Sequence, residues 1–165
     1  MYSVGDLIIK TNTGICEVVE ISELDFQVNK GLYYTLAPVD DQKTKVYVPV
    51  DPDPESVRLV MTHDEAEELL NNIPNIEPIE VENEKQREYQ YQQALKSNNP
   101  YRIAAIIKVL YQREQAKLAA GKKTTAVDKR YFIQAEKMLY SELAAALQIS
   151  EKEVPGLIRA KAMEG

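Results

Sequence analysis

The chain has 165 residues, of which 44% are hydrophobic and 28% are charged, and its formal net charge is −6. This length allows one domain or two small ones, and the apolar share is sufficient for a packed core. The single cysteine, Cys16, excludes an internal disulfide and a cysteine-based zinc site. The sequence has no apolar run of the roughly 18 to 20 residues that span a bilayer, and its N-terminus lacks a signal-peptide pattern. We therefore expect a cytoplasmic protein without a membrane partner.

The first 60 residues have the pattern of short β-strands separated by turns. Strands are predicted at residues 4–9, 14–21, 32–38, 45–50 and 57–60, with turn signals at 12–14, 29–31 and 40–42. Five short strands at this spacing predict a small, strongly bent sheet or an SH3-like (Tudor-like) barrel. Pro49 cannot donate a backbone hydrogen bond, so the fourth strand is expected either to lie at an edge of the sheet or to be short.

The hydrophobic period then changes from strand-like to helical. Thr62 and Glu65 form a capping-box pattern that predicts a helix start, and Thr125 with Asp128 resembles another. A further capping box is expected at Ser150, with Glu153 as its partner. Helices are predicted at about 62–72, 83–96, 100–120 and from 125 onward, with a short one through 157–158; Phe132, Ala135, Leu139, Leu143 and Ala146 line the face of the long fourth helix. The fold class is therefore α+β, with a compact domain of four to five helices after the sheet.

Positive charge is concentrated in one segment of this acidic chain. Residues 85–137 hold twelve Lys and Arg against four Asp and Glu, whereas residues 63–84 hold eight acids and no Lys or Arg. A net charge of +8 in one segment favours a surface that faces a polyanion. The alternative is that these charges are only the solvated faces of amphipathic helices.

The sequence offers no constellation of catalytic residues. His63 is the only histidine and follows a predicted helix N-cap, so a surface or capping role is expected. Cys16 lies in a β-strand pattern and is expected to be a small buried apolar residue. There is no phosphate-binding glycine loop and no nucleophile motif. We expect a protein that is not an enzyme and that binds neither a metal nor a cofactor.

Several strings in a fixed order carry a family resemblance. In the first half they are VGDLI at 4–8, GICEV at 14–18, YYTL at 33–36, VYVP at 46–49, Arg58 and 61–62; in the second half they are 103–113, 128–130 and 135–143. Together they resemble the CarD/CdnL family of bacterial transcription regulators. The N-terminal part is also similar to the RNA-polymerase-interacting domain of the transcription-repair coupling factor.

The resemblance implies two domains with separate partners. Residues 1–60 would form a Tudor-like domain that binds the β subunit of bacterial RNA polymerase by β-augmentation, in which sheet edges pair through main-chain hydrogen bonds. The pairing edge would be Lys45, Val46, Tyr47 and Val48. Residues 61–165 would form a helical domain that contacts the sugar-phosphate backbone and the minor groove of promoter DNA. The protein would alter the stability of open promoter complexes. Nothing in the sequence indicates an obligate dimer, so we expect a monomer.

The basic segment supplies the expected DNA contacts. They are the cations near predicted helix starts or in loops: Lys85, Arg87, Lys123, Lys129 and Arg130. Many family members have a tryptophan at the start of the first basic helix, where it wedges into the minor groove. This chain has no tryptophan, and the matching position is about Glu84, with Tyr89 and Tyr91 nearby. The alternative function is a polymerase-docking adaptor that does not bind DNA.

Overall fold

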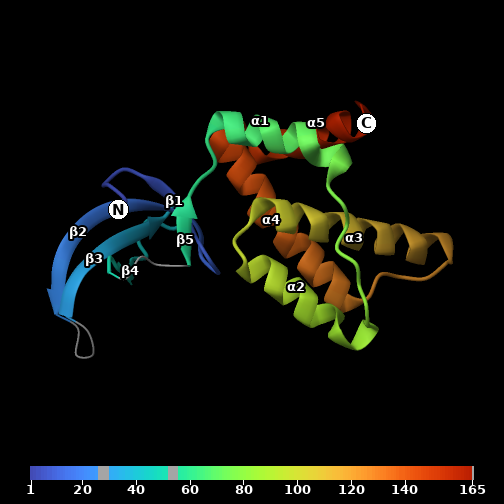
Figure 1. The fold of residues 1–165 in the computed structure, drawn as a ribbon, viewed down its shortest axis with the longest axis horizontal. Coiled ribbons are helices and arrows are strands. Elements are labelled where there is room, and N and C mark those ends of the chain that lie inside the picture. The colour runs from blue at the N-terminus through green and yellow to red at the C-terminus, as the bar shows by residue number, and fades with distance from the viewer. Residues whose placement is uncertain (26–29, 52–55, 165) are drawn as a thin grey trace. The chain divides into compact units, whose positions relative to one another are not determined.

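The computed structural model describes residues 1–25, 30–51 and 56–164. The chain forms two compact units, residues 1–60 and residues 61–165. The first unit contains a five-stranded sheet and the second contains helices, so the predicted α+β class is confirmed (Figure 1).

The N-terminal unit is an antiparallel sheet with strand order β4-β3-β2-β1-β5. Its strands are β1 (Leu7–Lys10), β2 (Gly14–Asp25), β3 (Lys30–Pro38), β4 (Val46–Pro49) and β5 (Val57–Leu59). The long β2–β3 ribbon is strongly curved (Figure 1), and its register shifts between Val18 and Glu20. A β-bulge of this kind increases the local twist, which accounts for the predicted bend.

Turn residues explain the tight connection between β1 and β2. Asn12 has a φ of 70° and Gly14 a φ of 97°, and these are residue types that tolerate a positive φ. Of the other two predicted turns, one is present and one is not seen in its described residues. A turn follows β3 as expected, but the signal at 29–31 was wrong for Lys30 and Gly31, which belong to β3, and Asn29 lies outside the described residues.

The core of the sheet consists of buried apolar side chains from its strands and includes the cysteine. Ile8, Val18, Tyr34 and Leu36 are at most 1% exposed, and Cys16 is fully buried as predicted. Burial raises the pKa of the Cys16 thiol. A protonated buried thiol is a poor nucleophile, so Cys16 acts as a packing residue.

Strand β4 lies at one end of the sheet order, as the proline at its end predicts. Pro49 is paired with Tyr33 of β3, and Tyr47 with Thr35. The strand is shorter than the predicted range 45–50, since Lys45 and Val50 lie just outside it.

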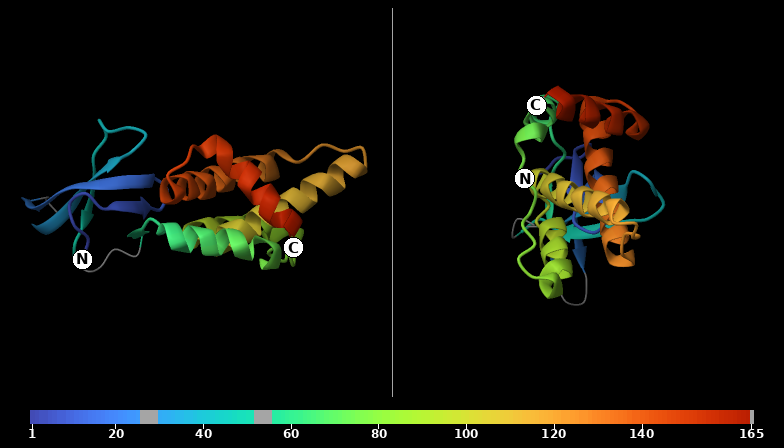
Figure 2. Two further views of the ribbon diagram at one scale, coloured as in Figure 1. Left: turned by 90° about the horizontal axis from the view of Figure 1, so that it is seen from above. Right: turned by 90° about the vertical axis from the view of Figure 1, so that its right-hand side faces the viewer.

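The second unit contains five α-helices within its described residues. They are α1 (His63–Asn72), α2 (Arg87–Lys96), α3 (Pro100–Ala119), α4 (Ala126–Leu147) and α5 (Val154–Glu164), with 3-10 turns η1 (Ile73–Asn75), η2 (Glu84–Gln86) and η3 (Glu151–Glu153). The two views in Figure 2 show α5 (red) against α1 (green), and α3 packs along α4.

Helix starts follow the predicted caps in most places. Thr62 Oγ1 accepts from Glu65 N at 3.1 Å, and Glu65 Oε1 accepts from Thr62 N at 3.0 Å, which completes the predicted capping box. Thr125 Oγ1 accepts from Asp128 N at 3.2 Å. The Asp128 carboxylate accepts from Arg87 instead of completing a capping box. The predicted capping box at Ser150 was wrong, because the Ser150 side chain makes no capping hydrogen bond, although Ser150 does precede η3 and α5. Its backbone carbonyl instead accepts from Glu153 N, the bond that closes a 3-10 turn.

The helical core forms where the apolar faces of the helices meet. Ala135, Leu139 and Leu143 are at most 2% exposed, as the helical period predicts, and Phe132 and Ala146 are partly buried against them. Their partners from other elements include Leu69, Leu70, Tyr91, Ile106 and Leu110. The segment 76–83 is extended, and its apolar side chains pack on the same core.

Candidate functional site

The five cations predicted to contact DNA lie on three short stretches of the helical unit. Lys85 is in η2, Arg87 begins α2, and Lys123 lies in the connection before α4. Lys129 and Arg130 lie near the start of α4. Four of the five are exposed, but the Arg87 side chain is only 16% exposed.

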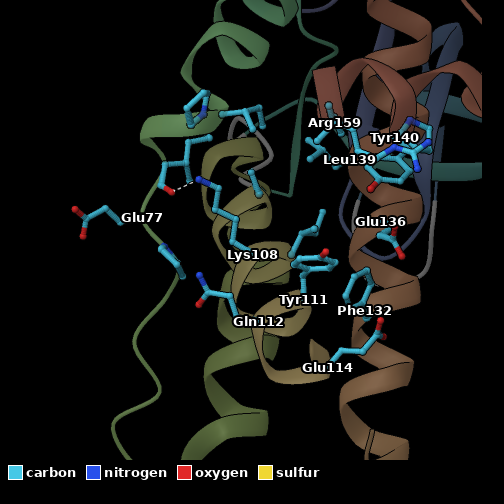
Figure 3. A pocket seen from close by; sticks show the side chains of 18 of the residues that line it. Glu77, Lys108, Tyr111, Gln112, Glu114, Phe132, Glu136, Leu139, Tyr140 and Arg159 are labelled. Carbon is cyan, nitrogen blue, oxygen red and sulfur yellow. Dashed lines mark hydrogen bonds between the residues drawn. The ribbon is translucent and has the colours of Figure 1, made fainter. Parts of the chain in front are cut away.

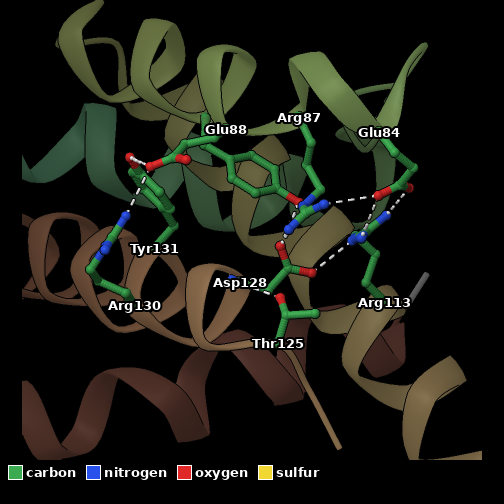
Figure 4. Close-up of polar contacts among 9 residues, drawn as sticks. Glu84, Arg87, Glu88, Arg113, Thr125, Asp128, Arg130 and Tyr131 are labelled. Carbon is green, nitrogen blue, oxygen red and sulfur yellow. Dashed lines mark hydrogen bonds and ion pairs between the residues drawn. The ribbon is translucent and has the colours of Figure 1, made fainter. Parts of the chain in front are cut away.

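Arg87 belongs to a group of paired polar side chains, most of them buried, that we call the arginine cluster. It is made of Glu84, Arg87, Tyr91, Arg113 and Asp128. Asp128 Oδ1 accepts from Arg87 Nε at 2.9 Å, and Oδ2 accepts from Arg113 Nε at 2.8 Å. Tyr91 Oη also donates to Asp128 Oδ1, at 3.1 Å. Figure 4 shows both guanidinium groups between Asp128 and Glu84. The cluster therefore ties η2 and the starts of α2 and α4 to α3.

The inner part of the arginine cluster is a structural ion-pair network. The Asp128 side chain is 3% exposed, and two cations and a phenol satisfy its carboxylate. Burial and the nearby Asp128 charge raise the pKa of Tyr91, so this phenol remains a donor at neutral pH. A buried charge is tolerated when it is paired and hydrogen-bonded in this way.

The outer part of the arginine cluster is closed by Glu84. Its carboxylate accepts from Arg113 Nη1 at 2.8 Å, from Arg113 Nη2 at 3.2 Å and from Arg87 Nη1 at 2.9 Å. The Glu84 side chain is 65% exposed, whereas the Arg113 side chain is only 21% exposed. The hydrogen bonds from Arg113, and then its charge, hold the pKa of Glu84 below its ordinary value. Arg87 and Arg113 thus direct their outer donors to a carboxylate of the protein itself.

Arg130 is also paired, but at the surface. Its Nη2 donates to Glu88 Oε1 at 2.9 Å, and its guanidinium carbon lies 5.0 Å from the centroid of the Tyr131 ring. The Arg130 side chain is 62% exposed. Exposed pairs of this kind contribute at most about 1 kcal/mol, so Glu88 orients Arg130 without preventing it from binding another anion.

Aromatic side chains near η2 divide into one buried and one exposed. Tyr91 is fully buried in the arginine cluster, whereas Tyr89 is 62% exposed. Tyr89 is therefore the aromatic residue at the start of α2 that an external partner can reach.

The pairings of the arginine cluster were missed by sequence reasoning. The spacing of Asp128 after Thr125 was interpreted as a helix cap, and Arg113 was not among the five predicted DNA contacts. The only signal in the sequence for these ion pairs was Asp128 itself, an acid beside Lys129 and Arg130 at a basic helix start. The partners Arg87 and Asp128 are separated by 41 residues, and a local pattern carries no information on such a contact.

A groove of 1270 Å³ lies elsewhere in the helical unit, between segment 73–78 and helices α3, α4 and α5. Figure 3 shows Tyr111 on α3 facing Phe132 on α4 across it. Lys108 Nζ donates to the Ile76 carbonyl, and burial lowers the pKa of this lysine. Burial raises the pKa of Glu136, and burial and the charge of Glu136 raise that of its neighbour Tyr140.

The groove is lined by apolar side chains and by charges of both signs. Its described lining residues include no His or Cys, and its basic residues Lys108, Lys129 and Arg159 are matched by three glutamates. Within the described part of the chain, no group of three His, Cys, Asp or Glu residues is placed to hold a metal ion.

The strand predicted to bind a partner, β4, presents alternate residues to the core and to solvent. Val48 is 5% exposed and belongs to the core of the sheet, and Val46 is half-buried. Tyr47 between them is 47% exposed, and Lys45 before the strand is also exposed. An exposed aromatic on a strand at the end of a sheet is a feature that a second chain can recognise.

Two family models match the chain, and together they cover nearly all of it. The model described as CarD-like/TRCF RID domain matches residues 2–60, and the model described as CarD, C-terminal domain matches residues 62–159. No curated protein matches the chain. Among the residues that the structure describes, none of the helices is both long enough and apolar enough to cross a membrane.

Proposed function

We propose that this chain, which belongs to the CarD family of RNA-polymerase-interacting transcription proteins, docks on the polymerase β subunit and contacts promoter DNA at the same time. Its two units would divide these tasks, with residues 1–60 binding polymerase and residues 61–165 binding DNA. It would act in the cytoplasm as a monomeric, non-enzymatic regulator of bacterial transcription. It would alter the stability of the open promoter complex by binding the open and the closed complexes with different affinities.

Strand β4 is the proposed docking edge for polymerase. It ends the sheet order, and an edge strand is a template for an added strand. Main-chain hydrogen bonds would supply affinity, and the exposed Tyr47 and Lys45 would supply selectivity. Val46 and Val48 would hold the strand on the core of its own sheet.

One observation carries the proposed DNA contact: Lys85, Lys123, Lys129 and Arg130 all remain exposed after the basic segment has folded. Cations of this kind bind phosphates, which position a protein on DNA without reading its sequence. Only a few such contacts are needed, because docking on polymerase raises the local concentration of the helical unit near the promoter.

A second candidate function is a polymerase-docking adaptor that does not bind DNA. The observation that favours it is that two of the five predicted DNA contacts, Arg87 and Arg130, already pair with carboxylates of the protein.

Charge reversal at the start of α4 separates the two functions. The variant Lys129→Glu/Arg130→Glu should lose binding to a short DNA duplex and retain binding to the isolated polymerase β subunit. Lys137→Glu/Lys152→Glu provides a control with the same change of charge outside the predicted contacts. Equal duplex binding by both double variants would favour the adaptor.

A further inference from the structure

We propose that Arg87 and Arg113 form a phosphate-binding site that Glu84 closes, and that a DNA backbone phosphate enters by displacing this carboxylate. The inference rests on the proposed DNA contact and adds a site to it. It also explains how Arg87, which is buried in the arginine cluster, can still serve as a DNA contact.

Asp128 prepares the two guanidinium groups for an anion. It accepts from the Nε atom of each arginine, so both planar groups are held in place while Nη donors of both remain available for a second anion. Three of these outer Nη donors converge on Glu84, at 2.8, 2.9 and 3.2 Å. Arginine binds carboxylates and phosphates with the same forked geometry, so the position of Glu84 also suits two phosphate oxygens.

The charges favour exchange of one anion for another. Two arginines and Asp128 leave a net charge of +1, which Glu84 neutralises. A backbone phosphate carries one negative charge as well, so its entry restores the same balance. The low pKa of Glu84 means that protonation does not open the site near neutral pH.

The position of Glu84 allows this exchange at low cost. Its side chain is 65% exposed, so solvent reaches the carboxylate, whereas Arg87 and Arg113 behind it are mostly buried. Glu84 lies in the short 3-10 turn η2, after an extended segment, and not inside a long helix. Lys85 follows it directly and Lys129 follows Asp128, so exposed cations neighbour both carboxylates of the cluster in sequence.

The test compares Glu84→Gln with Glu151→Gln. The second substitution removes the same charge from an exposed pair with Lys137, where no arginine pair is present. Binding to a short DNA duplex is measured by fluorescence anisotropy over a range of salt concentrations. Glu84→Gln should bind about tenfold more tightly than Glu151→Gln. Its affinity should also fall more steeply with salt, by about 0.9 in the logarithmic slope, as expected for one added phosphate contact.

A double variant tests the role of the arginine fork. In Glu84→Gln/Arg113→Lys the charge is kept but the forked donor is lost, so the gain in affinity should disappear. If this variant does not fold, as judged by circular dichroism, NMR of Glu84→Gln provides the same test. Titration with inorganic phosphate should then shift the Nε–Hε signals of Arg87 and Arg113.

The outcomes separate this inference from the proposed function on which it rests. Equal duplex affinity of Glu84→Gln and Glu151→Gln, with Lys129→Glu/Arg130→Glu still losing binding, would overturn the arginine site and leave the DNA contact intact. Shifts of the two arginine signals by inorganic phosphate, without duplex binding by any variant, would support an anion site and reject DNA as its ligand. Absence of these shifts and of any gain in affinity would overturn the site.

Discussion

At the scale of single residues, Asp128 is the buried acid of the arginine cluster and pairs with both of its arginines. It is nearly inaccessible to solvent, and it holds two arginines and a tyrosine that come from α2 and α3. Its local role as the third residue after Thr125 was readable from the sequence, but its long-range role was not. The sequence also predicted the burial of Cys16, since a small apolar residue in a strand pattern has few alternatives.

Substituting Asp128 should destabilise the helical unit strongly. Asp128→Asn removes the carboxylate charge that pairs with two mostly buried guanidinium groups, and we expect a loss of about 3 kcal/mol in the free energy of unfolding. Urea denaturation measures the loss. Glu88→Gln, which weakens the exposed pair with Arg130, should cost less than about 1 kcal/mol. Equal losses in the two variants would contradict a structural role for the arginine cluster.

Glu84 should make a pH-dependent contribution to stability. Hydrogen bonds from Arg113 lower its pKa in the folded state from the ordinary value of 4.5. A carboxyl group with a lowered pKa stabilises the fold above its unfolded pKa, and this contribution is lost as the pH falls through the folded value. The stability difference between wild type and Glu84→Gln should therefore be constant near neutral pH and shrink below pH 4.5. A difference that did not change with pH in thermal unfolding would contradict the pairing of Glu84 with the arginines.

At the scale of elements, a capping box was predicted correctly where a side chain caps the helix. It was predicted wrongly where a backbone hydrogen bond closes a 3-10 turn. Thr62 and Ser150 both precede a Glu by three residues, but only Thr62 forms the capping box. The difference arises because η3 is a 3-10 turn, in which the Ser150 carbonyl already satisfies Glu153 N.

This pair of positions gives a matched test of capping. Thr62→Ala should lower the free energy of unfolding by about 1 kcal/mol, because Glu65 N loses its acceptor. Ser150→Ala should change it by less than about 0.5 kcal/mol. Chemical denaturation of both variants checks the prediction, which a larger effect at Ser150 would contradict.

The two end strands of the sheet give a matched test of docking. Tyr47 on β4 and Leu59 on β5 are both about half exposed, at 47% and 53%. Tyr47→Ala should weaken binding to the polymerase β subunit about tenfold, because an exposed aromatic at the proposed edge is lost. Leu59→Ala should leave the affinity unchanged, as surface plasmon resonance would show. The reverse pattern would place docking on β5.

At the scale of the whole molecule, the change of hydrophobic period near residue 60 predicted the order of sheet and helices. Period 2 and period 3.6 impose different core faces, so a single sequence distinguishes them over long segments. The fate of the basic residues was harder to predict, because exposure depends on carboxylates supplied by other elements. Lys129 stays exposed, whereas Arg87, which is also at a helix start, forms a mostly buried ion pair with Asp128.

The lifetime of open promoter complexes tests the central claim most directly. It is measured with purified bacterial RNA polymerase and a promoter that forms short-lived open complexes, with and without the protein. We predict that the wild type lengthens the lifetime and that Lys129→Glu/Arg130→Glu loses this effect while still binding the β subunit. An unchanged lifetime under conditions where the wild type is bound to the β subunit would contradict the proposal that docking and DNA contact act together.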